Sequence, residues 1–252
     1  MTRNENEGPE ERARRFAREM EAVYGADLAS VVLYGSAARG EYRPGTSDLN
    51  VLVLLNDVSP AALRKASEAA RAWVAEGNPP PLMMSVDEWR GSADVWAIEL
   101  ADMRDAHVAV TGPDPFQGLE IRLEDLRMQC ERELKGKQIQ LRERYLLFAG
   151  QPAELGELLT RSFSTFLVLF RTVLRLSGEG GVRDAETVVQ RVAERAGFNP
   201  VPVVEVLRAR TAGHKLNPQA DSPVVVGYLD AVARVVEYVD GLAHGGAELP
   251  RA

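Results

Sequence analysis

Apolar residues recur along this chain in two kinds of pattern, and the pattern changes near the middle. In the first half, short apolar runs alternate with segments of helical periodicity, whereas the second half shows helical periodicity alone. The apolar runs predict strands and the periodic segments predict helices. We therefore expect an α+β protein, with a mixed β-sheet and flanking helices in residues 1–116 and an all-helical bundle in residues 117–252.

The elements of the first half follow from apolar spacing and from the positions of glycine and proline. A helix is predicted over residues 9–24, where apolar residues three and four apart form one face before Gly25. A second helix is expected to begin after Ser59, an N-cap residue in front of a proline, and to end near Ala75. Strands are expected at residues 30–34, 49–55, 82–86, 95–103 and 107–110.

Five amphipathic segments predict the helices of the second half, and glycine- or proline-containing stretches separate them. These segments are residues 123–148, 153–176, 184–196, 201–212 and 223–243. Two of them, 153–176 and 223–243, carry long apolar stripes. The stripes are expected either to form the core of the bundle or to pair between two chains in a homodimer.

The most informative local signal lies between the first two strands. Gly35 and Ser36 end the first strand abruptly and predict a turn into a short helix, where exposed N–H groups bind phosphate. Ser47 and Asp48 precede the second strand, and Asn50 shares a strand face with Asp48 because the two are separated by one residue. A phosphate cradle beside metal-binding oxygens indicates metal-assisted phosphoryl or nucleotidyl transfer.

The order of these residues resembles the nucleotidyltransferase superfamily that includes DNA polymerase beta and the aminoglycoside nucleotidyltransferases. In that family Gly-Ser is followed by a variable spacer and then by Asp-x-Asp or Asp-x-Glu in a hydrophobic strand. The residues that fit are Gly35, Ser36, Gly40, Ser47 and Asp48. Asn50 stands where the second acid is expected. The two-part plan is also similar to that of kanamycin-nucleotidyltransferase-like proteins, in which a helical bundle follows the sheet domain.

The resemblance implies a Mg²⁺-dependent transfer of a nucleoside monophosphate from ATP or another triphosphate to a hydroxyl of a small-molecule or protein acceptor. Asp48 and Asn50 are then metal ligands. The amide oxygen of Asn50 can bind a cation but carries no charge, so weaker metal binding and impaired turnover are expected. The alternative is a catalytically weak or inactive protein of this fold that binds nucleotide or a protein partner.

The family also needs a third acid on a neighbouring strand, as a metal ligand or as a general base. Glu99 is the first candidate, because it lies among apolar residues in the expected strand 95–103, where a carboxylate is costly. Asp102 is the second candidate, on the opposite face of a regular strand. Asp87 is the third, although it is also expected to begin a helical turn.

Three basic residues are candidates for binding the triphosphate. Arg39 and Arg43 flank the motif, and each is expected either to clamp phosphates or to be solvated. Lys137 lies within the apolar stripe of the helix over 123–148, next to Gly136, a poor helix former. The resemblance implies that this helix faces the active cleft. Lys137 is therefore expected either to reach the phosphates or to extend from the stripe edge to water.

Composition narrows the choice of partners and location. The formal net charge of −7 disfavours binding of bulk nucleic acid, which depends on clustered cations. A single cysteine, Cys130, excludes an intrachain disulfide and favours a reducing, cytoplasmic location. The most apolar helix candidate contains Arg171 and Arg175, so no membrane span is expected.

Overall fold

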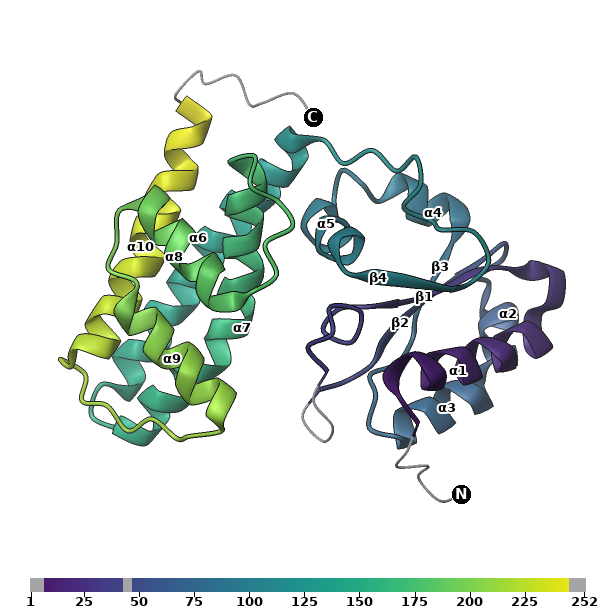
Figure 1. Ribbon diagram of the computed structural model, residues 1–252, viewed down its shortest axis with the longest axis horizontal. Coiled ribbons are helices and arrows are strands. Elements are labelled where there is room, and N and C mark those ends of the chain that lie inside the picture. The colour runs from purple at the N-terminus through teal and green to yellow at the C-terminus, as the bar shows by residue number, and fades with distance from the viewer. Residues whose placement is uncertain (1–6, 43–46, 245–252) are drawn as a thin grey trace. The chain divides into compact units, whose positions relative to one another are not determined.

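The computed structural model describes residues 7–42 and 47–244 (Figure 1). The chain consists of two compact units, residues 1–121 and 122–252, whereas the sequence pattern places the boundary after residue 116. Phe116 is only 6% exposed, and its ring packs edge-on against Trp89 with the ring centroids 5.1 Å apart. This aromatic contact makes the residues around Phe116 part of the first unit.

The first unit is built on a mixed sheet, as the sequence predicts, with four strands among the described residues. Its strands are β1 (Leu28–Tyr34), β2 (Asn50–Leu55), β3 (Leu82–Ser85) and β4 (His107–Thr111). Their order is β3-β2-β1-β4. β1 is antiparallel to both β2 and β4, whereas β2 and β3 are parallel. The two central strands are buried almost throughout, which explains their continuous apolar runs.

Helices cover both faces of this sheet (Figure 1). Alternate residues of the central strands point to opposite faces, so each strand contributes to two cores. On one face, residues such as Val53 pack with residues of α1 (Pro9–Tyr24) and α3 (Ser67–Ala75). On the other face, residues such as Leu52 pack with residues of α4 (Val86–Gly91) and α5 (Ala97–Asp105). A short helix, α2 (Pro60–Lys65), precedes α3, so the single helix predicted after Ser59 is divided at Ala66.

The strand predicted over residues 95–103 is wrong, because most of this segment forms α5. Ala97, Leu100 and Ala101 are three and four residues apart and are buried, whereas Glu99 is exposed. A short apolar run fits both a strand and a buried helix, and here the alanine, leucine and methionine content favours the helix. The sheet therefore has four strands among the described residues, and Glu99 lies on a helix.

The second unit is a helical bundle, as predicted. Its helices are α6 (Leu123–Phe148), α7 (Pro152–Leu176), α8 (Ala185–Ala196), α9 (Val201–Ala212) and α10 (Pro223–His244). The apolar sides of α7 and α10 are buried within the bundle, where Phe166 and Tyr228 pack edge-on at 6.1 Å between ring centroids. These stripes therefore form the core of one chain and not a dimer interface. Homodimer formation stays a prediction that needs another surface.

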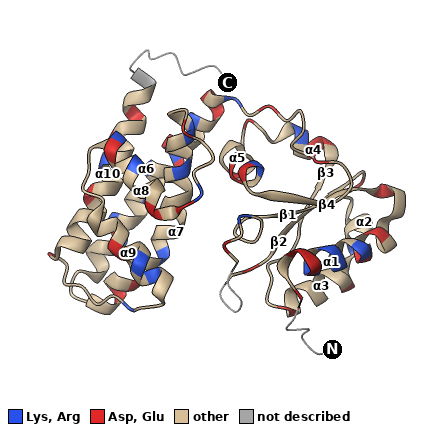
Figure 2. Ribbon diagram, viewed as in Figure 1, with Lys and Arg blue, Asp and Glu red and all other residues tan. Residues whose placement is uncertain are grey.

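Acidic and basic residues are interspersed along α1 and α6 (Figure 2). On α6, Glu131 accepts ion pairs from Arg127 at 2.8 Å and from Lys135 at 2.7 Å, each four residues away. Such pairs stabilise an exposed helix by about 0.2–0.5 kcal/mol each. They also neutralise these cations, which would otherwise be available to nucleic-acid phosphates. None of the described helices combines the length and apolar character needed to cross a bilayer.

Candidate active site

The chain leaves β1 through a sharp turn over residues 35–40. Gly35 has φ of 82°, a left-handed conformation in which a side chain is strained. Its N–H donates to the carbonyl oxygen of Ala106 at 3.1 Å, and its own carbonyl accepts the N–H of Arg39 at 3.1 Å. Left-handed Gly40 (φ 79°) ends the turn, with two backbone bonds in the Schellman arrangement. The predicted short helix is thus a single helical turn.

Three consecutive backbone N–H groups in this turn are available to a ligand. Within the described part of the chain, the N–H groups of Ser36, Ala37 and Ala38 donate to neither backbone nor side-chain acceptors. Successive N–H groups after a left-handed residue form a concavity that binds anions. The turn is therefore suited to a phosphate group, and Ser36 adds a hydroxyl to it.

Asn50 lies directly beside this turn. It is the first residue of β2 and is paired across the sheet with Tyr34, the last residue of β1. A Cβ placed on Gly35 would lie 3.4 Å from Nδ2 of Asn50. The Asn50 side chain therefore reaches the backbone of the turn, and the two segments singled out in the sequence meet in the fold.

Asp48 and Ser47 precede β2 in a segment without regular structure. Asp48 is exposed and Ser47 is half-buried, whereas Leu49 between Asp48 and Asn50 is fully buried. In an extended chain, alternate side chains leave the backbone on the same side. Asp48 and Asn50 are thus expected on the side opposite Leu49. Residues 43–46, which include Arg43, lie outside the described residues.

Arg39 is directed into the first unit and not toward solvent. Its Nη2 lies 2.9 Å from Oδ2 of Asp102 on α5, and its Nη1 lies 3.4 Å from Oδ1. The two side chains are 9% and 17% exposed. This forked pair ties the turn to α5. The predicted binding of phosphate by Arg39 stays a prediction.

Glu99 and Asp102 share one face of α5, because residues three apart on a helix are neighbours. The strand prediction placed them on opposite faces and is wrong on this point. Asp102 bonds to Arg39, so this face of α5 is the one directed toward the turn. Glu99 lies one helical turn before Asp102 and is exposed. The fold thus places both acid candidates on one face of α5, and the catalytic role of Glu99 stays a prediction.

Asp87 lies at the other end of the sheet. β3 runs parallel to β2 with Ser85 beside Leu55, and Asp87 follows Ser85 in α4. Five residues of strand separate Leu55 from Asn50, which corresponds to about 16 Å. Asp87 is therefore too distant to act together with Asn50, and α5 is the element that brings carboxylates toward the turn.

A family model described as "Nucleotidyltransferase domain" matches residues 12–147, which is more than half of the chain. The chain belongs to the nucleotidyltransferase domain family. The match extends from α1 into α6, so it includes the turn, β2 and Lys137. The identification made from Gly35, Ser36 and Asp48 is confirmed.

A solved structure agrees with the nucleotidyltransferase fold. It is the crystal structure of spectinomycin adenyltransferase AAD(9) from Enterococcus faecialis with ATP and spectinomycin. The two chains are 12% identical with a TM-score of 0.55, and the match covers 89% of this chain and 98% of that one. At this identity the likeness establishes the fold, including the two-part plan. A comparison with curated protein sequences finds no match.

The oxygen donors of Asp48 and Asn50 are of the kind that would suit one Mg²⁺ ion. Asp48 offers a carboxylate and Asn50 an amide oxygen. Among the described residues, no three His, Cys, Asp or Glu side chains are grouped to hold a metal. Proteins commonly bind Mg²⁺ through one or two carboxylates, with substrate phosphates and water completing the shell. A second, bridged ion fits poorly, because Asn50 lacks the charge that bridging requires.

Lys137 belongs to the helical unit and faces a cavity there. It is half-buried on α6, beside the predicted apolar stripe, and its Nζ lies 3.5 Å from Oε1 of Gln140. With Arg144 and Arg161 it lines a cavity of about 330 Å³ between α6 and α7. Next to it, a Cβ on Gly136 would meet no described atom within 4 Å. Contact of Lys137 with nucleotide phosphates stays a prediction.

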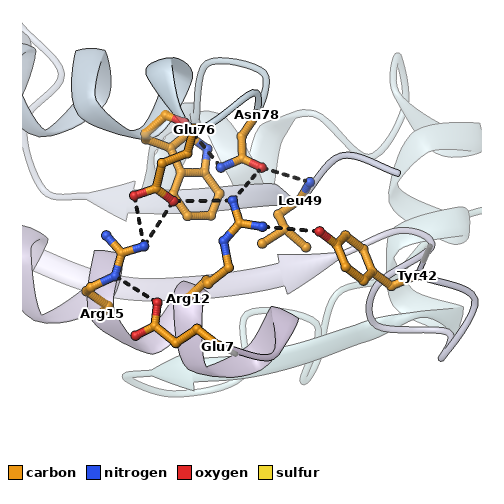
Figure 3. A network of polar contacts seen from close by, with 8 residues as sticks. Glu7, Arg12, Arg15, Tyr42, Leu49, Glu76 and Asn78 are labelled. Carbon is orange, nitrogen blue, oxygen red and sulfur yellow. Dashed lines mark hydrogen bonds and ion pairs between the residues drawn. The ribbon is translucent and has the colours of Figure 1, made fainter. Parts of the chain in front are cut away.

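A polar network beside the site was not predicted from the sequence (Figure 3). Arg12 on α1 donates to Oη of Tyr42 at 3.1 Å, to Glu76 at 3.2 Å and to Oδ1 of Asn78 at 3.4 Å. The same Asn78 oxygen accepts the N–H of Leu49 at 3.3 Å. These residues come from four separate segments of the chain. No local pattern in the sequence signals that they meet.

The ion pairs of Glu76 predict a specific pH dependence of stability. Hydrogen bonds and charge from Arg15, and then from Arg12, hold the pKa of Glu76 below its usual 4.5. The stabilisation is therefore complete above the unfolded-state pKa and is lost as the pH falls through the lower folded-state pKa. Glu76→Gln is expected to reduce the free energy of unfolding at neutral pH, with a difference from wild type that vanishes in acid.

Urea unfolding between about pH 7 and about pH 3 measures this difference. The matched control is Glu10→Gln on α1, since Glu10 and its partner Arg14 are 55% and 60% exposed. Exposed pairs of this kind contribute little, so the control should follow wild type. A Glu76→Gln difference that stays constant with pH would contradict the assignment.

Proposed function

We propose that this chain uses Mg²⁺ and a nucleoside triphosphate, with ATP as the donor, to transfer a nucleoside monophosphate to a hydroxyl of a small-molecule acceptor. The observation that carries the proposal is the meeting of the open N–H groups of residues 36–38 with Asn50 at the adjoining end of β2. Membership of the family supports nucleotidyl transfer. The likeness to an adenyltransferase solved with ATP and spectinomycin supports the choice of donor and of acceptor class.

The residues of the site have distinct roles in this proposal. The N–H groups of residues 36–38 and the hydroxyls of Ser36 and Ser47 bind phosphate oxygens. The oxygens of Asp48 and Asn50 hold Mg²⁺, which when bound neutralises charge on the phosphates. Glu99 accepts the proton of the acceptor hydroxyl. At the same time, the hydroxyl oxygen forms a bond to the α-phosphorus and pyrophosphate leaves. Glu99 therefore acts as a general base and not as a required metal ligand.

The neutral side chain of Asn50 makes this a slow enzyme. A carboxylate at this position would add a unit of negative charge beside the cation, whereas the amide supplies only a dipole. Even when screened at an effective dielectric constant near 80, unit charges about 4 Å apart interact by about 1 kcal/mol. The missing charge thus weakens Mg²⁺ binding and leaves charge on the phosphates less well neutralised.

Asn50→Asp tests this proposal by restoring the charge. It is expected to lower the Mg²⁺ requirement by about tenfold or more and to raise pyrophosphate release, because the double charge of Mg²⁺ doubles the interaction to about 2 kcal/mol, and about 1.4 kcal/mol corresponds to a tenfold change. The measurement is pyrophosphate release with ATP and a panel of aminoglycosides, including spectinomycin, across a Mg²⁺ titration. Asn56→Asp adds the same charge at the opposite, exposed end of β2 and should leave both quantities unchanged.

A wild-type chain that turns over well and gains nothing from Asn50→Asp would show that the argument from the missing charge is incorrect. A wild-type chain with no Mg²⁺-dependent triphosphate binding at all would contradict the proposed function itself. Calorimetric titration of ATP with and without Mg²⁺ separates these two results.

A second candidate is a protein that binds nucleotide, or a protein partner, without turnover. The observation in its favour is that the described residues contain no group of three acids around the turn, where Asn50 replaces one of them. It predicts Mg²⁺-dependent ATP binding with no pyrophosphate release by wild type. Release that appears only in Asn50→Asp would favour this candidate over the slow enzyme.

A further inference from the structure

The polar network around Arg12 ends on the peptide group that follows Asp48. The N–H of Leu49 belongs to the same planar unit as the carbonyl of Asp48. An acceptor that holds this N–H therefore restrains rotation on both sides of the peptide group, including the Asp48 Cα–C bond. That acceptor is Oδ1 of Asn78, at 3.3 Å.

Asn78 is itself held in a single orientation by the core. It is 6% exposed, and its Nδ2 donates to the carbonyl oxygen of Trp73 at 3.1 Å. Trp73 is 2% exposed and packs on Phe16 of α1, with ring centroids 4.8 Å apart. Because the amide nitrogen is committed to Trp73, the amide oxygen must face Leu49. A rigid part of the first unit thus reaches the backbone beside Asp48.

Arg12 connects the same asparagine to the chain on the other side of residues 43–46. Its side chain is 16% exposed, and its guanidinium donates both to Asn78 and to the hydroxyl of Tyr42 (Figure 3). Glu76 holds this guanidinium at 3.2 Å and also accepts from Arg15 at 2.9 Å. One cation therefore bridges two points that flank the segment leading to Asp48.

We propose that Asn78 is the positioning residue for Asp48, and that Arg12 supports it. Asp48 precedes the paired part of β2, so within residues 7–42 and 47–244 no ladder hydrogen bond orients it, and its carboxylate direction depends on its backbone. Asn78 sets that backbone so that the carboxylate lies beside Asn50, where Mg²⁺ is to be held. The inference rests on the proposed function, because it assigns Asp48 to the metal.

Asn78→Ala is the direct test. It removes the acceptor of the Leu49 N–H, and it is expected to raise the Mg²⁺ concentration for half-maximal binding of a non-hydrolysable ATP analogue about tenfold. Affinity for the analogue without metal should stay within about twofold of wild type, since the N–H groups of residues 36–38 are not part of the network. A merely structural role would lower both affinities together.

The variant Asn78→Asp keeps an acceptor oxygen for Leu49, loses the donor to Trp73 and adds a negative charge beside the Arg12 guanidinium. It should return the Mg²⁺ requirement to within about twofold of wild type even if the protein unfolds at lower urea.

Tyr42→Phe removes only the hydroxyl that binds Arg12, and the Mg²⁺ requirement is expected to rise about two- to threefold. Tyr42→Phe keeps the test decisive if Asn78→Ala does not fold. Arg14→Gln, at an exposed position of the same helix as Arg12, is the control and should match wild type.

The failures of the inference and of the proposed function are distinguishable. Unchanged Mg²⁺ requirements in Asn78→Ala and Tyr42→Phe, with Mg²⁺-dependent binding by wild type, would overturn the inference alone. A parallel loss of metal-free and metal-dependent affinity would also overturn it, because it would assign Asn78 to folding only. Absence of Mg²⁺-dependent binding by wild type would overturn the proposed function and this inference with it.

Discussion

Asp48→Asn is expected to lower Mg²⁺-dependent nucleotidyl transfer by about a thousandfold, the upper range for removing one group that stabilises the transition state. In the proposed site, Asp48 supplies the carboxylate and Asn50 an amide. The substitution would leave two neutral amides facing the cation and the phosphates. Asp48 is exposed and Asn has the same shape, so the free energy of unfolding should change little.

The measurement is turnover with ATP and acceptor, together with the Mg²⁺ dependence of ATP binding. Asp27→Asn is the matched control, because Asp27 is an exposed carboxylate at the far end of β1 from Gly35. It should retain wild-type turnover. Full activity of Asp48→Asn, with a normal fold, would remove Asp48 from the site and with it the proposed metal position.

Gly156→Ala is expected to destabilise the helical unit by about 2–3 kcal/mol, a typical cost of overpacking. Gly156 lies within α7, and a Cβ there would be 2.0 Å from the carbonyl oxygen of Leu216 and 2.6 Å from its carbonyl carbon. Backbone atoms cannot move aside as a flexible side chain can. The chain that precedes α10 would have to move away from α7.

A glycine-to-alanine substitution in α6 should change the free energy of unfolding in the opposite direction. A Cβ on Gly136 meets no described atom within 4 Å, so Gly136→Ala should stabilise the protein by about 0.5–1 kcal/mol through helix propensity. Urea unfolding of the two variants beside wild type measures both effects. Destabilisation by Gly136→Ala would indicate a close contact at that position. Stability of Gly156→Ala equal to that of wild type would contradict the contact with Leu216.

The helices and strands that were predictable are those with one unambiguous pattern. β2 has a continuous apolar run because both faces of the strand are buried, and α6 has apolar residues at helical spacing because one side is buried. The segment that forms α5 satisfies both patterns over a few residues. The fold decides that this segment is a helix, because β4 pairs directly with β1 and occupies the position beside that strand in the sheet.

In the candidate site, too, some features follow from the local sequence and others only from the fold. The turn at Gly35 and the presence of Asn50 at the start of β2 were visible in the sequence because they depend on covalent neighbours. The pairing of Arg39 with Asp102 was not visible, and it changes the expectation for both residues. Before the fold was known, Asp102 was a candidate acid and Arg39 a candidate phosphate ligand.

The sequence by itself thus determined the two-part plan, the family and the residues that begin the site, because each follows from local spacing. Only the tertiary structure decided which face carries Glu99, what Arg39 binds and how Asn78 holds the backbone beside Asp48. Arg39 and Asp102 are 63 residues apart, and Arg12 and Asn78 are 66 apart. Contacts at such separations arise from the packing of helices on the sheet, and local patterns of residues do not encode them.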